Sequence, residues 1–136
     1  RMSQLDTPAT RLLQAALTGL ATRQRVIANN VANADTPQFK ASAVTFEGQL
    51  RQAMGAGDRL RLTPVANGLP DDSAPPRVTP QIVTLNTTTR RLDGNNVDID
   101  EQMVQLAETN LSYNALTQLL ANRLQLLRTV INDGRR

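Results

Sequence analysis

The sequence of 136 residues contains no cysteine and no histidine. This absence excludes thiolate chemistry, disulfide bonds, zinc sites made of cysteine or histidine, and catalysis by an imidazole base. A serine or threonine nucleophile with a carboxylate or lysine base remains open, but Lys40 is the only lysine and no Gly-x-Ser-x-Gly motif occurs. We therefore expect a protein that is not an enzyme and that uses no metal and no cofactor.

Aromatic residues are scarce, at 2% of the chain, and comprise Phe39, Phe46 and Tyr113. Because 40% of the residues are hydrophobic, the buried surface must be mainly aliphatic and must come from packed helices or from another chain. No run approaches the ~20 apolar residues of a membrane span, and the N-terminus lacks the pattern of a cleaved secretory signal. We expect no membrane span, and any export must use a route that needs no such signal.

The charge balance is weakly basic, with 15 basic and 12 acidic residues and a pI near 10.5. The arginines are scattered from Arg11 to Arg128, and no aromatic residues that could stack on bases lie between the few close pairs. Ion pairs on the surface and at interfaces are favoured over nucleic-acid binding.

Five of the seven prolines fall between Pro64 and Pro80, so the chain divides into helix-forming ends and a broken centre. We expect three parts: residues 1–40 with an N-terminal helix, a middle region 41–97, and residues 98–136 with a C-terminal helix. The expected fold class is mainly α, with two long helices packed in a coiled-coil-like layer and a small irregular or β middle region.

The N-terminal helix is predicted to start at a Thr7 cap with Pro8 in its first turn, and to end near Ala34 because Pro37 disfavours helical Thr36. Its apolar stripe alternates by four and three residues, with a polar break at one position. The stripe comprises Leu13, Leu17, Leu20, Gln24, Ile27, Val31 and Ala34.

The C-terminal helix repeats this pattern over a longer span and would be about 50 Å long at ~1.5 Å per residue. Asp98, with Glu101 three residues later, resembles a capping box, and residues 132–134 are a plausible stop. The predicted seam comprises Ile99, Met103, Leu106, Asn110, Tyr113, Thr117, Leu120, Leu124, Leu127 and Ile131.

Further apolar positions widen the stripe of this helix beyond what one partner helix covers, so it is expected to contact several neighbours. They are Val104, Leu111, Leu116, Leu119, Leu126 and Val130. The alternative is an intramolecular hairpin in which these side chains form a small local core. The polar seam positions Asn110 and Thr117 either fix the alignment of the helices or face solvent at a gap between them.

In the middle region, Phe46, Leu50 and Met54 predict a short amphipathic helix. Residues 78–92 are rich in Thr, Val and Ile and predict one or two short strands closed by a turn at Asp93-Gly94, whereas residues 67–76 are expected to be a loop. The acidic run 93–101 does not fit a calcium loop because its glycine is misplaced, which favours a turn followed by a helix cap.

The segment 29–40, Asn-Asn-Val-Ala-Asn-Ala-Asp-Thr-Pro-Gln-Phe-Lys, resembles the N-terminal signature of flagellar rod and hook proteins. Its continuation through residues 43–47 and 50–51 resembles the FlgB type of proximal rod protein, and so does the stretch from Gly94-Asn95-Asn96-Val97-Asp98 to Tyr113 and Leu120. Two positions depart from the family pattern, because Phe39 replaces the more usual tyrosine and Gln38 stands where glycine is frequent.

This resemblance implies a structural subunit of the flagellar basal-body rod, whose terminal helices form the inner layer of a helical tube. The implied partners are copies of itself, other proximal rod subunits and the export-gate adaptor protein at the membrane ring. It also implies export through the flagellar type III apparatus without signal cleavage. Another axial rod subunit, or a cytosolic helical-hairpin adaptor, is the alternative.

The expected assembly residues lie in the signature segment. They are Asn29, Asn30, Asn33, Thr36, Pro37 and Phe39. The asparagine amides could form hydrogen bonds across a helix interface, or they could only weaken the helix before its proline stop. The resemblance favours a subunit contact. The expected packing seam comprises Leu13, Leu17, Leu20, Ile27, Val31, Met103, Leu106, Tyr113, Leu120, Leu124 and Leu127.

Overall fold

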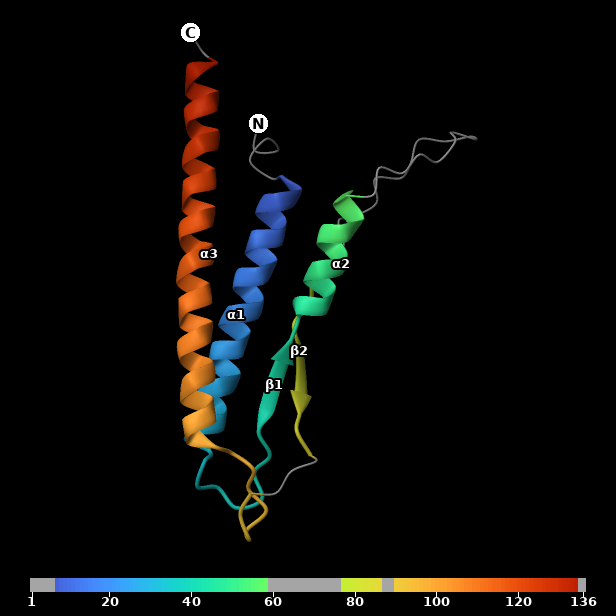
Figure 1. Cartoon of the computed structure of the whole chain (residues 1–136), viewed down its shortest axis with the longest axis vertical. Helices are drawn as coiled ribbons and strands as arrows, with labels where there is room; N and C mark the ends of the chain where they lie inside the picture. The colour runs from blue at the N-terminus through green and yellow to red at the C-terminus, as the bar shows by residue number, and fades with distance from the viewer. Residues whose placement is uncertain (1–6, 59–76, 87–89, 135–136) are drawn as a thin grey trace, which may run out of the picture.

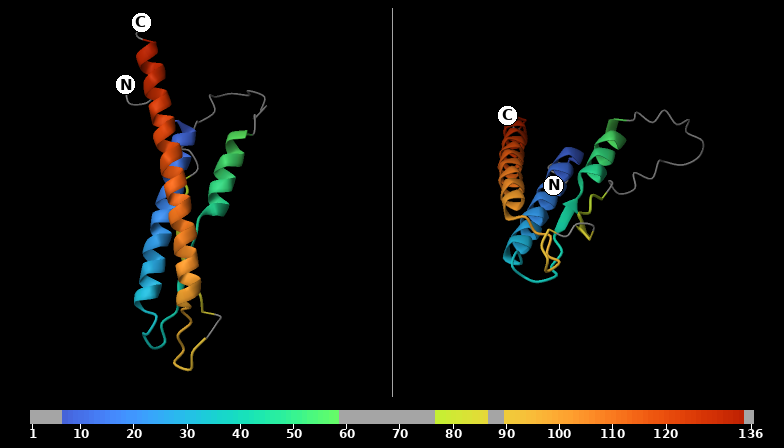
Figure 2. Two further views of the ribbon diagram at one scale, coloured as in Figure 1. Left: turned by 60° about the vertical axis from the view of Figure 1, so that its left-hand side comes forward. Right: turned by 60° about the horizontal axis from the view of Figure 1, so that its bottom comes forward.

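A computed structural model describes residues 7–58, 77–86 and 90–134. Its elements are α1 (Pro8–Ala32), β1 (Ser42–Thr45), α2 (Glu47–Asp58), β2 (Gln81–Thr84) and α3 (Ile99–Asp133). Two long helices and a small strand-containing middle region confirm the expected mainly α fold. Figures 1 and 2 show α1 at the centre, with α3 along one side of it and the strands and α2 along the other.

Both helix starts are as predicted. The Thr7 hydroxyl oxygen accepts a hydrogen bond from the backbone N–H of Thr10 at 3.2 Å, and Pro8 occupies the first turn of α1. Asp98 caps α3 by accepting from the backbone N–H groups of Asp100 and Glu101 at 3.0 and 3.3 Å. The carboxylate of Glu101 does not complete a capping box but lies 3.8 Å from the guanidinium of Arg90, outside the helix.

The two long helices pack antiparallel, as three side-chain contacts along them show. Asn30 bonds to Gln102, Gln24 donates to Asn110, and Arg123 lies beside Thr7. Gln24 and Asn110, the polar breaks of the two stripes, therefore face one another. A polar pair at matching levels fixes the alignment of two helices. α3 continues past the start of α1 (Figure 1).

The face of α3 that packs on α1 shares every second residue with the expected seam, and at the positions in between it uses the residue one place earlier in the sequence. It comprises the buried or half-buried Gln102, Leu106, Thr109, Tyr113, Leu116, Leu120, Arg123 and Leu127. Expected positions Met103 and Leu124 lie at the edge of this contact, 46% and 40% exposed. Their packing between subunits stays a prediction.

The main core lies between α1, β1 and the start of α2. It consists of Leu20, Val26, Val44 and Phe46, and half-buried Leu50, Val78, Tyr113 and Leu116 pack against it. Phe46 fits because α1 has a glycine beneath it: a Cβ built on Gly19 would lie 2.6 Å from two atoms of the Phe46 ring. The core is therefore small and depends on this close approach of ring and helix.

The strand predicted in residues 78–92 is present as β2, but its partner differs from the expectation. It pairs antiparallel with β1, with Ser42 opposite Thr84 and Thr45 opposite Gln81, and is not closed into a hairpin by Asp93-Gly94. Buried Val44 holds β1 against α1. The backbone groups along the edge of β1 are therefore available to pair with β2. The predicted short helix is α2, and the expected loop 67–76 lies outside the described residues.

Candidate assembly site

Three buried asparagines connect α1 and the signature segment with β1, with the chain after β2 and with the start of α3. Asn30, Asn95 and Asn96 are 1%, 0% and 7% exposed. A buried side-chain amide needs hydrogen-bond partners for both its N–H groups and its oxygen. Each of these asparagines therefore fixes the position of the backbone groups that it bonds to.

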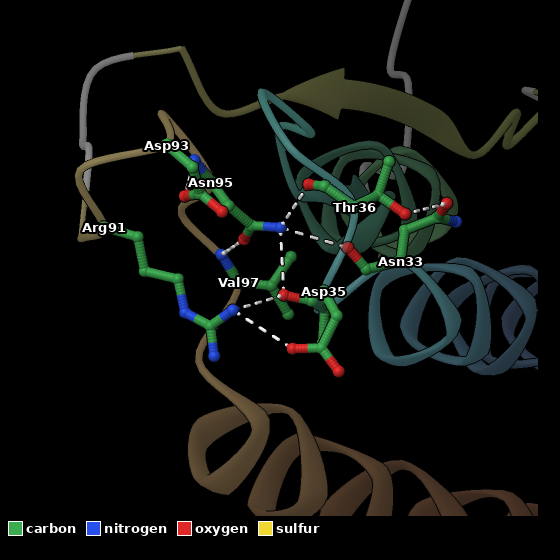
Figure 3. Close-up of polar contacts among 8 residues, drawn as sticks. Asn33, Asp35, Thr36, Arg91, Asp93, Asn95 and Val97 are labelled. Carbon is green, nitrogen blue, oxygen red and sulfur yellow. Dashed lines mark hydrogen bonds and ion pairs between the residues drawn. The ribbon is translucent and has the colours of Figure 1, made fainter.

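Asn95 holds the end of α1 against the turn before α3 (Figure 3). Its side-chain nitrogen lies 3.1, 3.0 and 2.8 Å from the carbonyl oxygens of Asn33, Ala34 and Thr36. Its side-chain oxygen accepts from the backbone N–H of Val97 at 2.8 Å. One amide therefore bonds to three carbonyls of the turn that follows α1 and holds that turn against the residues before α3.

An ion pair closes the outside of the same junction. Arg91 donates to the Ala34 carbonyl at 3.2 Å and to the Asp35 carboxylate at 3.1 Å (Figure 3). Lys40, the only lysine, donates to the carbonyl of Gly94 at 2.6 Å. Arg91 reaches from the turn before α3 to the signature turn, and Lys40 reaches from the signature segment to the turn before α3. The two charged side chains therefore hold these turns together.

Asn30 acts as a partner for the start of β1. Its side chain accepts from the N–H of Ser42 at 3.0 Å and donates to the Ser42 carbonyl at 2.8 Å and to Gln102 at 2.9 Å. Asn96 similarly accepts from the N–H of Ala41 and donates to the Leu85 carbonyl, both at 2.6 Å. These amides fix the sheet to both long helices.

The remaining signature residues lie closer to the surface. Asn33 donates to the carbonyl and side-chain oxygens of Asn29, both at 2.8 Å, and accepts from Thr36 at 3.2 Å. Pro37 is exposed, and Phe39 packs against a small cluster of Ala34, Ala41 and Val97. The structure thus gives these residues contacts within one chain, and their role between subunits stays a prediction.

The signature turn contains a strained residue at a position where the resemblance expects glycine. Gln38 has φ +61°, in the left-handed region that favours glycine. Its N–H donates to the Asp93 carbonyl at 2.9 Å, and Gly94 opposite has φ +84°. The departure at position 38 is therefore tolerated at some cost in backbone strain.

Arg23 and Glu47 form an ion pair at the end of the core. The Arg23 guanidinium lies 5.0 Å from the centre of the Phe46 ring and donates to the Val44 carbonyl and to Glu47. Burial alone would raise the pKa of Glu47, but the hydrogen bonds from Arg23 and from the backbone hold that pKa below its usual value. Both side chains are partly exposed, so the pair contributes modestly.

A second candidate surface is the part of α3 that does not face α1. It carries large hydrophobic side chains that remain 43–74% exposed. They are Ile99, Met103, Val104, Leu111, Leu119, Leu126, Val130 and Ile131. None of the helices in the part of the chain that the structure describes is long and apolar enough to cross a membrane. An apolar face of this extent marks a site of contact with other protein.

The sequence analysis named Asn95 and Asn96 only as part of the stretch that resembles the family, and it assigned no site role to them or to Gln102 and Arg123. Their roles depend on which residues meet after folding, and asparagine or glutamine in a loop or helix gives no local signal of burial. The available hint was the double asparagine between a turn glycine and a helix cap, where an amide can bond to nearby backbone.

Comparison with known proteins agrees with this geometry. A family model described as "Flagella basal body rod protein" matches residues 11–40, which include most of α1 and the signature segment. This match points to the class of structural rod proteins of the bacterial flagellar basal body.

Individual relatives narrow the class. The flagellar basal body rod protein FlgB of Bacillus subtilis is 32% identical over 123 residues, covering 90% of this chain and 92% of the relative. The FlgB proteins of Borrelia hermsii and Escherichia coli are 35% and 31% identical, covering 82% and 98% of this chain and 87% and 99% of theirs. The chain belongs to the FlgB family of flagellar basal body rod proteins.

Proposed function

We propose that this rod subunit polymerises through α1 and α3, packing against copies of itself and other proximal rod subunits, and that the assembled helices transmit motor torque. Residues 1–40 and 98–136 would supply the inner layer, and residues 41–97 would brace it from outside. Many parallel helix contacts resist shear through the sum of small packing energies.

The observation that carries this proposal is the surplus apolar face of α3. α1 covers one side of α3, yet Leu111, Leu119, Leu126 and Val130 remain 74%, 53%, 64% and 62% exposed. Burying each such side chain contributes roughly 1.5–3 kcal/mol, so a neighbouring subunit that covers several of them gains substantial free energy. A free-standing hairpin adaptor would leave this surface in water without benefit.

Two further expectations belong to the same proposal. The subunit is exported through the flagellar type III apparatus with no signal cleaved, and it contacts the export-gate adaptor protein at the membrane ring. Both are supported by the family resemblance alone.

The test is deletion of the gene combined with purification of basal bodies. The deletion strain should grow normally but lack filaments and swimming, and a plasmid copy should restore both. The chain should be present in purified basal bodies of the complemented strain, with an N-terminus that mass spectrometry shows to be uncleaved. Normal filaments in the deletion strain would refute the proposal.

A further inference from the structure

The outer edge of β2 offers backbone groups for pairing. Ser42 of β1 lies opposite Thr84, and its N–H and C=O groups bond to the side chain of Asn30. Because bonding alternates along an antiparallel ladder, Thr84 and Ile82 direct their own N–H and C=O groups away from β1. Among the residues that the structure describes, none bonds to these four groups. An open strand edge of this kind is a site for contact with another chain.

The side chains of β2 are exposed as well, along all four residues of the strand. Ile82 and Val83 are 61% and 46% exposed, and Leu85, directly after the strand, is 43% exposed. Successive side chains of a strand point to opposite faces, so β2 presents apolar groups on both of its faces. This pattern is typical of a strand that is covered by protein on both sides.

The opposite edge of the same sheet is already paired with a helix. The Asn30 amide of α1 accepts from the Ser42 N–H at 3.0 Å and donates to the Ser42 carbonyl at 2.8 Å. Arg23, also on α1, donates to the Val44 carbonyl at 2.8 Å. Helix side chains thus take the place of a neighbouring strand. A helix that carries side-chain amides beside apolar side chains has the chemistry to pair with the edge of β2 in the same way.

The side of α3 that faces away from α1 has this composition. Its residues follow one another at spacings of three and four and therefore form one stripe along the helix. All of them are exposed, and Leu111 at the centre is 74% exposed. The stripe, called the outer stripe of α3, comprises Val104, Ala107, Leu111, Asn114 and Gln118. It combines apolar side chains with two amides.

The two surfaces lie on opposite sides of the molecule, because α3 and β2 flank α1 (Figure 1). One chain therefore cannot join its own β2 to its own outer stripe. Residues 99–122 of α3 contain three acidic residues and no basic residue, whereas residues 77–92 around β2 contain three arginines and no acidic residue. Opposite charge balances favour an approach of the two surfaces in different copies.

We propose that β2 of one copy packs across the outer stripe of α3 of a second copy, with Ile82 against Leu111 and the Asn114 amide bonded to the edge of β2. This inference rests on the proposed polymerisation and specifies one of its contacts. Because the contact joins two different surfaces, each copy uses β2 for one neighbour and α3 for the other. The same contact can therefore repeat from copy to copy.

The experiment is disulfide formation in purified basal bodies, which is specific because the native chain has no cysteine. A strain lacking the native gene produces the double variant Ile82→Cys/Leu111→Cys, and its basal bodies are oxidised before non-reducing electrophoresis. A disulfide requires Cα atoms within about 7 Å of one another. The double variant should give linked dimers and larger species that disappear on reduction.

The matched control is Ile82→Cys/Val130→Cys, because Val130 is 62% exposed on α3 but lies outside the outer stripe. This control should stay monomeric. Asn114→Ala should leave the folding of the purified chain unchanged and lower its incorporation into basal bodies about two- to tenfold, the effect of one lost hydrogen bond. Asn132→Ala, at another exposed asparagine of α3, should be incorporated like the wild type.

A double variant that stays monomeric in basal bodies, although Leu111→Cys alone is protected from maleimide there, would overturn the inference and leave the proposed function standing. Linked dimers of Ile82→Cys alone would also overturn it, because β2 would then pair with β2. Wild-type incorporation of Asn114→Ala would overturn the assigned hydrogen bond. If Ile82→Cys/Leu111→Cys is not incorporated, Val83→Cys/Val104→Cys replaces it under the same criteria. If the wild-type chain is itself missing from basal bodies, the proposed function fails instead.

Discussion

Replacing Gly19 by alanine should destabilise the chain, although alanine is the better helix former. In a helix interior this change ordinarily gains about 0.5–1 kcal/mol. Here the added Cβ would lie 2.6–2.7 Å from three ring atoms of Phe46, which is only 4% exposed. Buried overpacking costs about 1–3 kcal/mol, so the net loss lies between about 0 and 2.5 kcal/mol. The upper half of this range is expected because three ring atoms overlap with the added Cβ.

The assay is urea unfolding of the purified chain, followed by far-UV circular dichroism. Gly48→Ala is the matched control, because a Cβ at Gly48 in α2 would meet nothing within 4 Å. Gly48 lies in the first turn of α2, so the control should be stabilising by less than the about 1 kcal/mol of an interior position. In a Phe46→Leu background the smaller side chain removes the overlap, so Gly19→Ala should cost much less there. A Gly19→Ala variant as stable as Gly48→Ala would refute the packing argument.

Three other substitutions test the junction and the core. Asn95→Ala leaves three carbonyls and one N–H without their amide partner and should lower the unfolding free energy by about 2–3 kcal/mol in urea titrations, whereas exposed Asn114→Ala should change it by less than about 0.5 kcal/mol. Gln38→Gly relieves a left-handed backbone and should raise the free energy of unfolding by up to about 1 kcal/mol in urea titrations. A lower free energy of unfolding would contradict the strain at this position. Because the pKa of Glu47 is lowered on folding, its pair with Arg23 contributes above the unfolded pKa and is lost as pH falls through the folded pKa. Glu47→Gln should therefore reduce the loss of unfolding free energy between neutral and acidic pH, by less than about 1 kcal/mol. A loss identical to that of the wild type would contradict the pair.

Local features of this fold could be predicted from the sequence because their causes are local. Thr7 with Pro8 and Asp98 with its two following acidic residues each determine a helix start within one turn of chain. The end of α1 at Ala32, two residues before the predicted Ala34, reflects the same proline signal acting at short range.

Features that depend on contacts between distant residues could not be predicted in this way. The leucine-rich α3 offers two nearly equivalent seams, and the one that packs on α1 includes Gln102 and Thr109. Asn30 supplies a hydrogen-bond partner for Gln102, and the Thr109 hydroxyl donates to the Gln105 carbonyl of its own helix. Periodicity ranks polar positions low and so selected Met103 instead. Likewise, β2 shows strand character in its own sequence, but its partner β1 is fixed by the packing of Val44 on α1.

The central claim is that the surplus apolar face of α3 becomes buried between subunits in the rod. Because the chain contains no cysteine, one thiol introduced as Leu111→Cys reports on that face alone. Leu111 is 74% exposed in the single chain, so a maleimide reagent should label it rapidly in dilute monomer. In purified basal bodies labelling should fall at least about tenfold and return when the rod is dissociated in denaturant. Equal labelling of Leu111→Cys in monomer and in intact basal bodies would contradict the account.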